Sequence, residues 1–90
     1  FRALAIQSGS YAHCLGPLCR IPEKISKGHA PTVFLHGKKD LAVPVRTAHD
    51  YHERLDRLGV ETKMIVDPDF GHGWIDASPA AITEWFEIYL

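Results

Sequence analysis

The segment Thr32–His36 (TVFLH) carries apolar or β-branched side chains at consecutive rather than alternating positions. This pattern is typical of a strand that is buried on both faces, as in a parallel sheet covered by helices on either side. The segment is therefore predicted to be a central strand, and the rest of the chain has to supply the helices that cover it.

Arg46–Leu58 has the pattern of an amphipathic helix. Its apolar positions recur at spacings of three and four residues, as expected for one face of a helix packed on a sheet. Gly59 follows where a helix-ending residue takes a positive φ. The apolar positions are Ala48, Tyr51, Leu55 and Leu58.

Two further segments, Arg2–Gln7 and Thr62–Val66, have the composition of short strands. Ser78 and Pro79 are typical of an N-cap and of the first position of a helix, which predicts a last helix over Pro79–Leu90. The order of elements predicts an α/β, three-layer α/β/α arrangement with a parallel sheet and right-handed crossovers. The buried face of the last helix is predicted to be Ala81, Ile82, Trp85, Phe86 and Tyr89.

Three parallel strands do not close a sheet, and the outer strands would leave N–H and C=O groups unpaired. The 90 residues are therefore expected to be part of one larger domain, with the missing part before Phe1. On its own, the chain is expected to associate through its first strand or to be unstable.

The chain has 10 basic and 11 acidic residues and a formal charge of −1. It lacks the basic excess that would favour nucleic acid or an anionic membrane surface, so neither is predicted as a partner. Its apolar stretches are far shorter than the ~20 residues of a membrane span. No compartment is indicated.

Metal and cofactor sites are not predicted. Cys14 and Cys19 flank a Gly-Pro turn, so a disulfide and two buried thiols both remain open, but further zinc ligands are missing nearby. His49 and His52 are three residues apart on the predicted helix among charged neighbours, which favours a solvated face. No G-x-G-x-x-G motif follows a strand, which disfavours a dinucleotide site.

The residues that follow each strand are the most informative, because ligands of open α/β sheets bind beyond the carboxyl ends of the strands. Asp40 and His72 follow two neighbouring strands and are 32 residues apart. A carboxylate that accepts from an imidazole N–H fixes the tautomer and leaves the other nitrogen to take a proton. Asp40 is the candidate catalytic acid and His72 the candidate base, with Gly71 and Gly73 expected to let the backbone turn tightly around it.

Other interpretations of these residues stay open. Asp40 alone could form an Asx-turn, and His36 is expected to be a structural hydrogen-bonding residue under the acid loop. Trp74 either lines a substrate cleft or packs beside the last helix. The rival acids, expected instead to cap turns, are Asp67, Asp69 and Asp76.

His36-Gly37-Lys38-Lys39-Asp40-Leu41-Ala42-Val43-Pro44 and Gly71-His72 resemble the last two catalytic loops, H-G-x-x-D-x-x-V-P and G-H, of α/β-hydrolase-fold serine hydrolases. Less extensively, Ala5–Tyr11 (AIQSGSY) is similar to the segment before the acid in esterases of the polyester-depolymerase and feruloyl-esterase type. The resemblance implies the C-terminal part of a carboxylic ester hydrolase that acts on a small-molecule ester through an acyl-enzyme, without a cofactor. A serine peptidase of prolyl-oligopeptidase type and a non-catalytic interaction module are the alternatives.

The G-x-S-x-G nucleophile elbow of that family does not occur in these residues. Ser8 and Ser10 precede the acid, as the family order requires, but lack the paired glycines and following helix of an elbow. The nucleophile and the oxyanion hole are therefore expected in the upstream part of the same protein, and the 90-residue chain alone is expected to be inactive.

Overall fold

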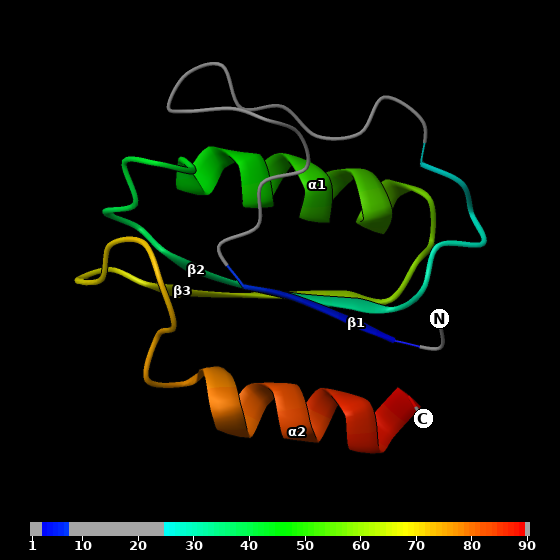
Figure 1. The fold of residues 1–90 in the computed structure, drawn as a ribbon. Helices are drawn as coiled ribbons and strands as arrows, with labels where there is room; N and C mark the ends of the chain where they lie inside the picture. Colours follow the sequence, from blue (N-terminus) through cyan, green and yellow to red (C-terminus); the bar gives the residue numbers. More distant parts are fainter. Residues whose placement is uncertain (1–2, 8–24, 90) are drawn as a thin grey trace.

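The computed structural model describes residues 3–7 and 25–89, which form a three-stranded sheet between two helices (Figure 1). The predictions that concern Arg2, Ser8, Ser10, Cys14 and Cys19 lie outside these residues. The elements, in chain order, are β1 (Leu4–Gln7), β2 (Thr32–Gly37), α1 (Val45–Arg57), β3 (Thr62–Asp67) and α2 (Ser78–Tyr89).

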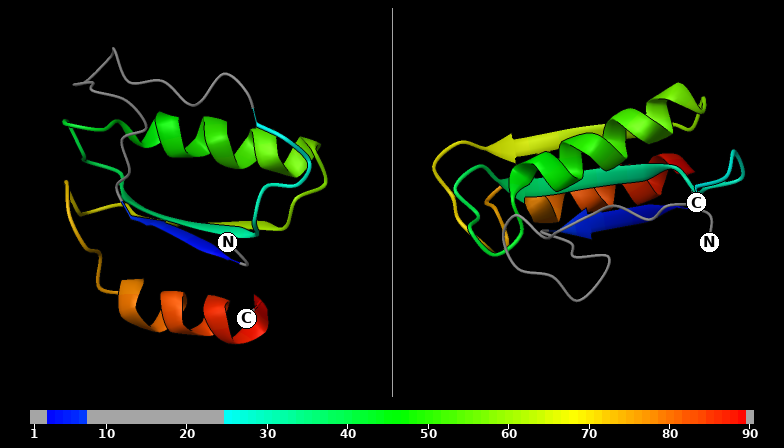
Figure 2. Two further views of the ribbon diagram at one scale, coloured as in Figure 1. Left: turned by 45° about the vertical axis from the view of Figure 1, so that its right-hand side comes forward. Right: turned by 90° about the horizontal axis from the view of Figure 1, so that it is seen from above.

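The strands are parallel and follow the order β1-β2-β3 (Figure 2). Leu4 pairs with Thr32 at the start of β1, and Thr32 pairs with Thr62 at the start of β3. The predicted parallel neighbours are therefore confirmed. β2 and β3 each continue one residue further than predicted, because Gly37 and Asp67 still pair with each other.

Helices cover the two faces of the sheet, which confirms the three-layer arrangement (Figure 1). β2 is buried along its whole length, as its run of apolar residues predicts. On one face, α1 packs Ala48, Tyr51 and Leu55 against Phe34 and Val60. On the other face, the predicted apolar positions of α2 pack against Ala3, Val33, Leu35 and Ile75.

Specific contacts form at the end of α1 and at the start of α2. Gly59 has φ 78°, which supports its predicted role after α1, and Val60 N–H donates to Leu55 O at 3.0 Å. At the start of α2, Ser78 is buried, and its hydroxyl donates to the Gln7 side chain at the end of β1. Ser78, predicted as the N-cap, is the first residue of α2, and its hydroxyl connects the helix to the first strand.

Two structural histidines lie on the α1 side of the sheet. His29 Nε2 lies 2.7 Å from the Tyr51 hydroxyl, and His52 Nδ1 lies 2.9 Å from Thr62 Oγ1. Within residues 3–7 and 25–89, no cluster of His, Cys, Asp and Glu could hold a metal ion. None of the helices described is long and apolar enough to cross a membrane.

Candidate active site

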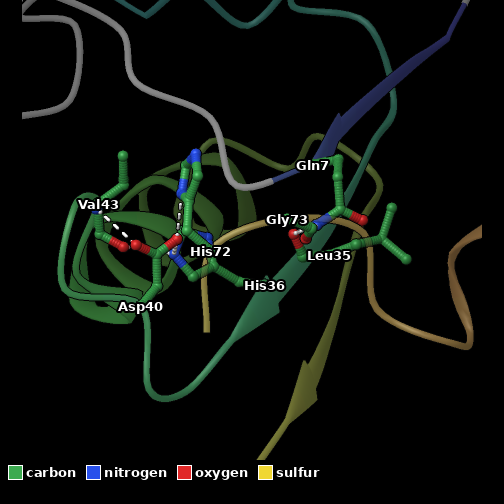
Figure 3. A network of polar contacts seen from close by, with 7 residues as sticks. All are labelled: Gln7, Leu35, His36, Asp40, Val43, His72 and Gly73. Atoms are coloured by element: carbon green, nitrogen blue, oxygen red, sulfur yellow. Dashed lines mark hydrogen bonds and ion pairs between the residues drawn. The ribbon is translucent and has the colours of Figure 1, made fainter. Parts of the chain in front are cut away.

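Asp40 and His72 meet at the carboxyl end of the sheet (Figure 3). Asp40 lies in the loop after β2 and is buried, whereas the side chain of His72, in the loop after β3, is 52% exposed. His72 Nδ1 donates to Asp40 Oδ2 at 2.7 Å. The expectation that these side chains lie within hydrogen-bond distance is confirmed, and their catalytic role stays a prediction.

The Asp40 carboxylate is held by a backbone donor from its own loop, by His72 and by a contact with His36 in β2. Oδ1 accepts from Val43 N–H at 2.7 Å, and Oδ2 lies 3.3 Å from His36 Nε2. The buried His36 donates from this same Nε2 to Val43 O at 2.6 Å, so Nε2 carries the proton. The predicted supporting role of His36 is confirmed. A turn contact of Asp40 with the backbone three residues on and its pairing with His72 coexist, because each uses a different oxygen of Asp40.

Backbone contacts hold the two loops against each other. Lys38 N–H donates to Asp67 O and Lys39 N–H donates to Phe70 O, both at 2.9 Å. Gly37 lies directly under this junction, where a Cβ would come within 2.1 Å of Gly71 O and 2.4 Å of Phe70 O. The loop that carries His72 can approach β2 this closely because residue 37 has no side chain.

The glycines on either side of His72 have different roles. Gly73 has φ 134°, a backbone conformation that residues with a side chain rarely adopt. This agrees with the predicted tight turn. Gly71 has no positive φ, and a Cβ there would only approach Lys39 O at 3.9 Å. The prediction that both glycines are needed for the turn is therefore supported for Gly73 alone. The sequence pattern predicted a role for Gly71, but the position that has no room for a side chain is Gly37.

The other residues considered for the site, which are the rival acids, Trp74 and the histidines of α1, have the following positions. Asp67 Oδ1 accepts from Asp69 N–H at 3.0 Å, the turn contact expected of that loop, and Asp69 and Asp76 are exposed. Trp74 is 62% exposed, which disfavours packing beside the last helix. His49 is exposed on α1, as predicted, but His52 is partly buried against Thr62 and Phe34, so the prediction of a solvated face is wrong for His52.

The arrangement supports one kind of chemistry. A buried carboxylate that holds Nδ1–H of an imidazole leaves Nε2 able to accept a proton from a nucleophile and to stabilise the resulting imidazolium. The orientation of Asp40 is fixed by its loop, while His72 keeps access to solvent. Such a pair can act as the acid and base of a catalytic triad.

One residue at this edge was missed by the sequence analysis. Gln7, the last residue of β1, donates from its side-chain amide to Gly73 O beside His72. Gln7 is the last residue of β1 and precedes the loop in which a functional residue was expected. Its position at the carboxyl end of a parallel strand was the available signal.

Most of the chain is similar to known proteins. Residues 21–89 match the prolyl oligopeptidase family. A poly(3-hydroxyoctanoate) depolymerase of Pseudomonas fluorescens is 47% identical over 89 residues, which cover 99% of this chain and 32% of the depolymerase.

Two plant proteins match a shorter stretch. An acylamino-acid-releasing enzyme of Oryza sativa subsp. japonica is 46% identical over 61 residues, covering 62% of this chain and 8% of that enzyme. Its counterpart from Arabidopsis thaliana is 40% identical over 60 residues, covering 67% of this chain and 7% of that enzyme. The chain thus spans about a third of the depolymerase and under a tenth of the plant enzymes. These matches and the parallel sheet place the chain in the prolyl oligopeptidase family of serine hydrolases, with the α/β-hydrolase fold.

Proposed function

We propose that this chain is the C-terminal part of a serine hydrolase that cleaves carboxylic esters, in which Asp40 orients His72 and His72 is the general base. The observation that carries the proposal is the 2.7 Å hydrogen bond from the half-exposed His72 ring to the buried Asp40 carboxylate. The nucleophilic serine and the oxyanion hole belong to the upstream part of the same protein.

The reaction has two halves. His72 Nε2 takes the proton of the serine hydroxyl as the oxygen attacks the ester carbonyl, and the imidazolium then gives that proton to the departing alkoxide. This leaves an acyl-enzyme. A water molecule, deprotonated by the same nitrogen, attacks the acyl carbon, and the proton returns to the serine oxygen as the acid leaves. Asp40 stays ionised and stabilises the imidazolium in both halves.

Two observations favour an ester with an apolar acyl chain. The relative that matches nearly the whole chain is named as a depolymerase of poly(3-hydroxyoctanoate), which is a polyester. Large apolar side chains with exposed surface also lie within two positions of Asp40 or His72 in the sequence. They are Leu41, Phe70 and Trp74, of which Leu41 is 89% exposed.

Cleavage of an acylated peptide is the second candidate. It is favoured by the 46% identity to an acylamino-acid-releasing enzyme over the stretch that includes most of this chain. A non-catalytic module with the same fold is the remaining alternative, and it would lack an upstream nucleophile.

The test uses the full-length protein with p-nitrophenyl octanoate and with an N-acetyl-amino-acid p-nitroanilide. We expect a burst of p-nitrophenol, an added acyl mass on an upstream serine, and faster turnover of the ester. His72→Gln should lower kcat by at least about 10³-fold. His52→Gln, which changes a histidine on the α1 side of the sheet, is the matched control and should retain activity. No turnover of either substrate, together with no upstream nucleophile, would favour the interaction module.

A further inference from the structure

The Gln7 side chain, at the end of β1, forms hydrogen bonds with several parts of the fold. Its Nε2 donates to Leu35 O at 3.2 Å and also to Gly73 O, while its Oε1 accepts from the Ser78 hydroxyl. These contacts connect β1 to β2, to the loop that carries His72, and to the start of α2. Two carbonyl acceptors on one side and a hydroxyl donor on the other determine which way the amide faces.

The contact with Gly73 lies immediately after His72 in the chain. Before His72, the loop is held where Lys39 N–H donates to Phe70 O. After His72, it is held where Gln7 donates to Gly73 O. The imidazole is therefore carried by a short segment that is fixed on both sides, and Gln7 fixes the side on which Gly73 adopts φ 134°. Figure 3 shows Gln7, Leu35 and Gly73 beside the group formed by Asp40 and His72.

The environment of the amide makes this arrangement specific. Ser78 is fully buried, and the Gln7 side chain is part of a partly buried network. A glutamate at position 7 would direct a carboxylate at two carbonyl oxygens, and a methionine would leave both carbonyls without this donor. Because the bond from Gln7 to Gly73 O would be lost, the backbone after His72 would be held less firmly.

We propose that Gln7 is a positioning residue for His72, which fixes the backbone after the base so that the imidazole stays aligned between Asp40 and the nucleophile. This inference rests on the proposed function, because alignment affects the rate only if His72 moves the proton. A displacement of about 1 Å of a reacting group can lower a rate by roughly 10²-fold.

The kinetic test compares Gln7→Met and Gln7→Glu with the parent full-length protein on p-nitrophenyl octanoate. Both variants should lower kcat by about 10- to 100-fold and leave KM within about twofold. Ser78→Ala should lower kcat less, and the pair Gln7→Met with Ser78→Ala should be no worse than Gln7→Met alone, because both changes act on one network.

Thr62→Val is the matched control. It removes a hydroxyl that contacts His52 at the opposite end of the sheet, and it should leave kcat unchanged. The inference is wrong if Gln7→Met keeps kcat within about twofold of the parent. It is also wrong if Thr62→Val lowers kcat as much as Gln7→Met does when the two variants lower Tm equally. If Gln7→Met does not fold, Ser78→Ala decides, and a loss of kcat below threefold would overturn the proposal.

The NMR signal of the His72 Nδ1 proton supplies a readout that does not depend on turnover. It should shift or broaden in Gln7→Met and stay unchanged in Thr62→Val, and an unchanged signal in both would overturn the inference. If His72→Gln retains full activity, the proposed function fails and this signal alone decides the positioning role. If His72→Gln is inactive but Gln7→Met matches the parent, only the role of Gln7 fails.

Discussion

Gly37 and Gly71 approach so closely that a Cβ on Gly37 would lie 2.1 Å from the carbonyl oxygen of Gly71. Gly37 ends β2, three residues before Asp40, and Gly71 directly precedes His72. The distance between the acid loop and the base loop therefore depends on the absence of a side chain at position 37.

Gly37→Ala should be strongly damaging, because the added methyl group meets backbone atoms rather than a flexible side chain. We expect a loss of roughly 1–3 kcal/mol in the free energy of unfolding, and a loss of esterase activity in the protein that remains folded. Gly28→Ala and Gly71→Ala are the controls, since a Cβ would meet its nearest neighbour at 3.7 Å and 3.9 Å respectively. Chemical denaturation of the three variants measures the difference. Equal stability of all three would contradict the steric argument.

Asp40→Asn should lower kcat by roughly 10³- to 10⁴-fold with little change in KM. With its oxygen facing Val43 N–H, the asparagine directs an NH₂ group at His72 Nδ1, which favours the wrong tautomer of the ring. Asp69→Asn changes an exposed carboxylate in the loop before His72 and is the matched control. Steady-state kinetics of the full-length variants checks this. Comparable losses in both variants would remove the distinction between the acid and its rivals.

Ionisation of Tyr51 makes the stability of the fold depend on pH in the alkaline range. Burial of the ring raises the pKa of the phenol above its ordinary value of 10.0. The unfolded chain therefore releases this proton at a lower pH than the folded protein does. The stabilisation from Tyr51 is complete below pH 10 and is lost as the pH rises from there through the folded pKa.

Tyr51→Phe should lower the free energy of unfolding by about 1 kcal/mol at neutral pH, because the contact with His29 Nε2 is lost. It should also reduce the fall in stability above pH 10. Denaturation curves for both proteins between pH 7 and 11 supply the test. Parallel pH dependences would show that Tyr51 does not contribute to the alkaline loss.

The isolated 90-residue chain should be inactive on activated esters, because the proposal assigns the nucleophile to the upstream part. Among the described residues, β1 pairs only with β2, so its other edge exposes backbone donors and acceptors that favour self-association. Turnover assays and light scattering of the purified chain measure both effects. Rapid hydrolysis would make Ser8 and Ser10 candidates for the nucleophile. A stable inactive monomer would contradict only the predicted self-association.

Sequence patterns predicted the features that depend on local periodicity or on a recognisable motif. The buried run at Thr32–His36 and the apolar spacing from Ala48 to Leu55 identified a strand and a helix close to their observed bounds. The pairing of Asp40 with His72 followed because parallel strands bring their carboxyl ends to one edge.

The features that were missed depend on contacts between distant residues. Gln7 meets Gly73 and Ser78 across 66 and 71 positions of the chain, and its place at the end of a strand does not predict these partners. The importance of Gly37 likewise follows from the loop that packs on it rather than from its own conformation. The sequence motif includes Gly37 beside His36, but the motif does not reveal that the base loop packs against this glycine.

The hydrogen bonds that hold Asp40 arise within residues 36–72, and the backbone contacts that join the two loops connect residues 37–71. The contacts between the acid and the base thus arise within one stretch of the chain, and β1 adds its pairing with β2 and the bond from Gln7 to Gly73. A stretch of this kind can be joined to different preceding sequences without redesign of its own interior. This modularity offers a physical reason why similar residues make up 32% of a bacterial depolymerase and 8% of a much longer plant enzyme.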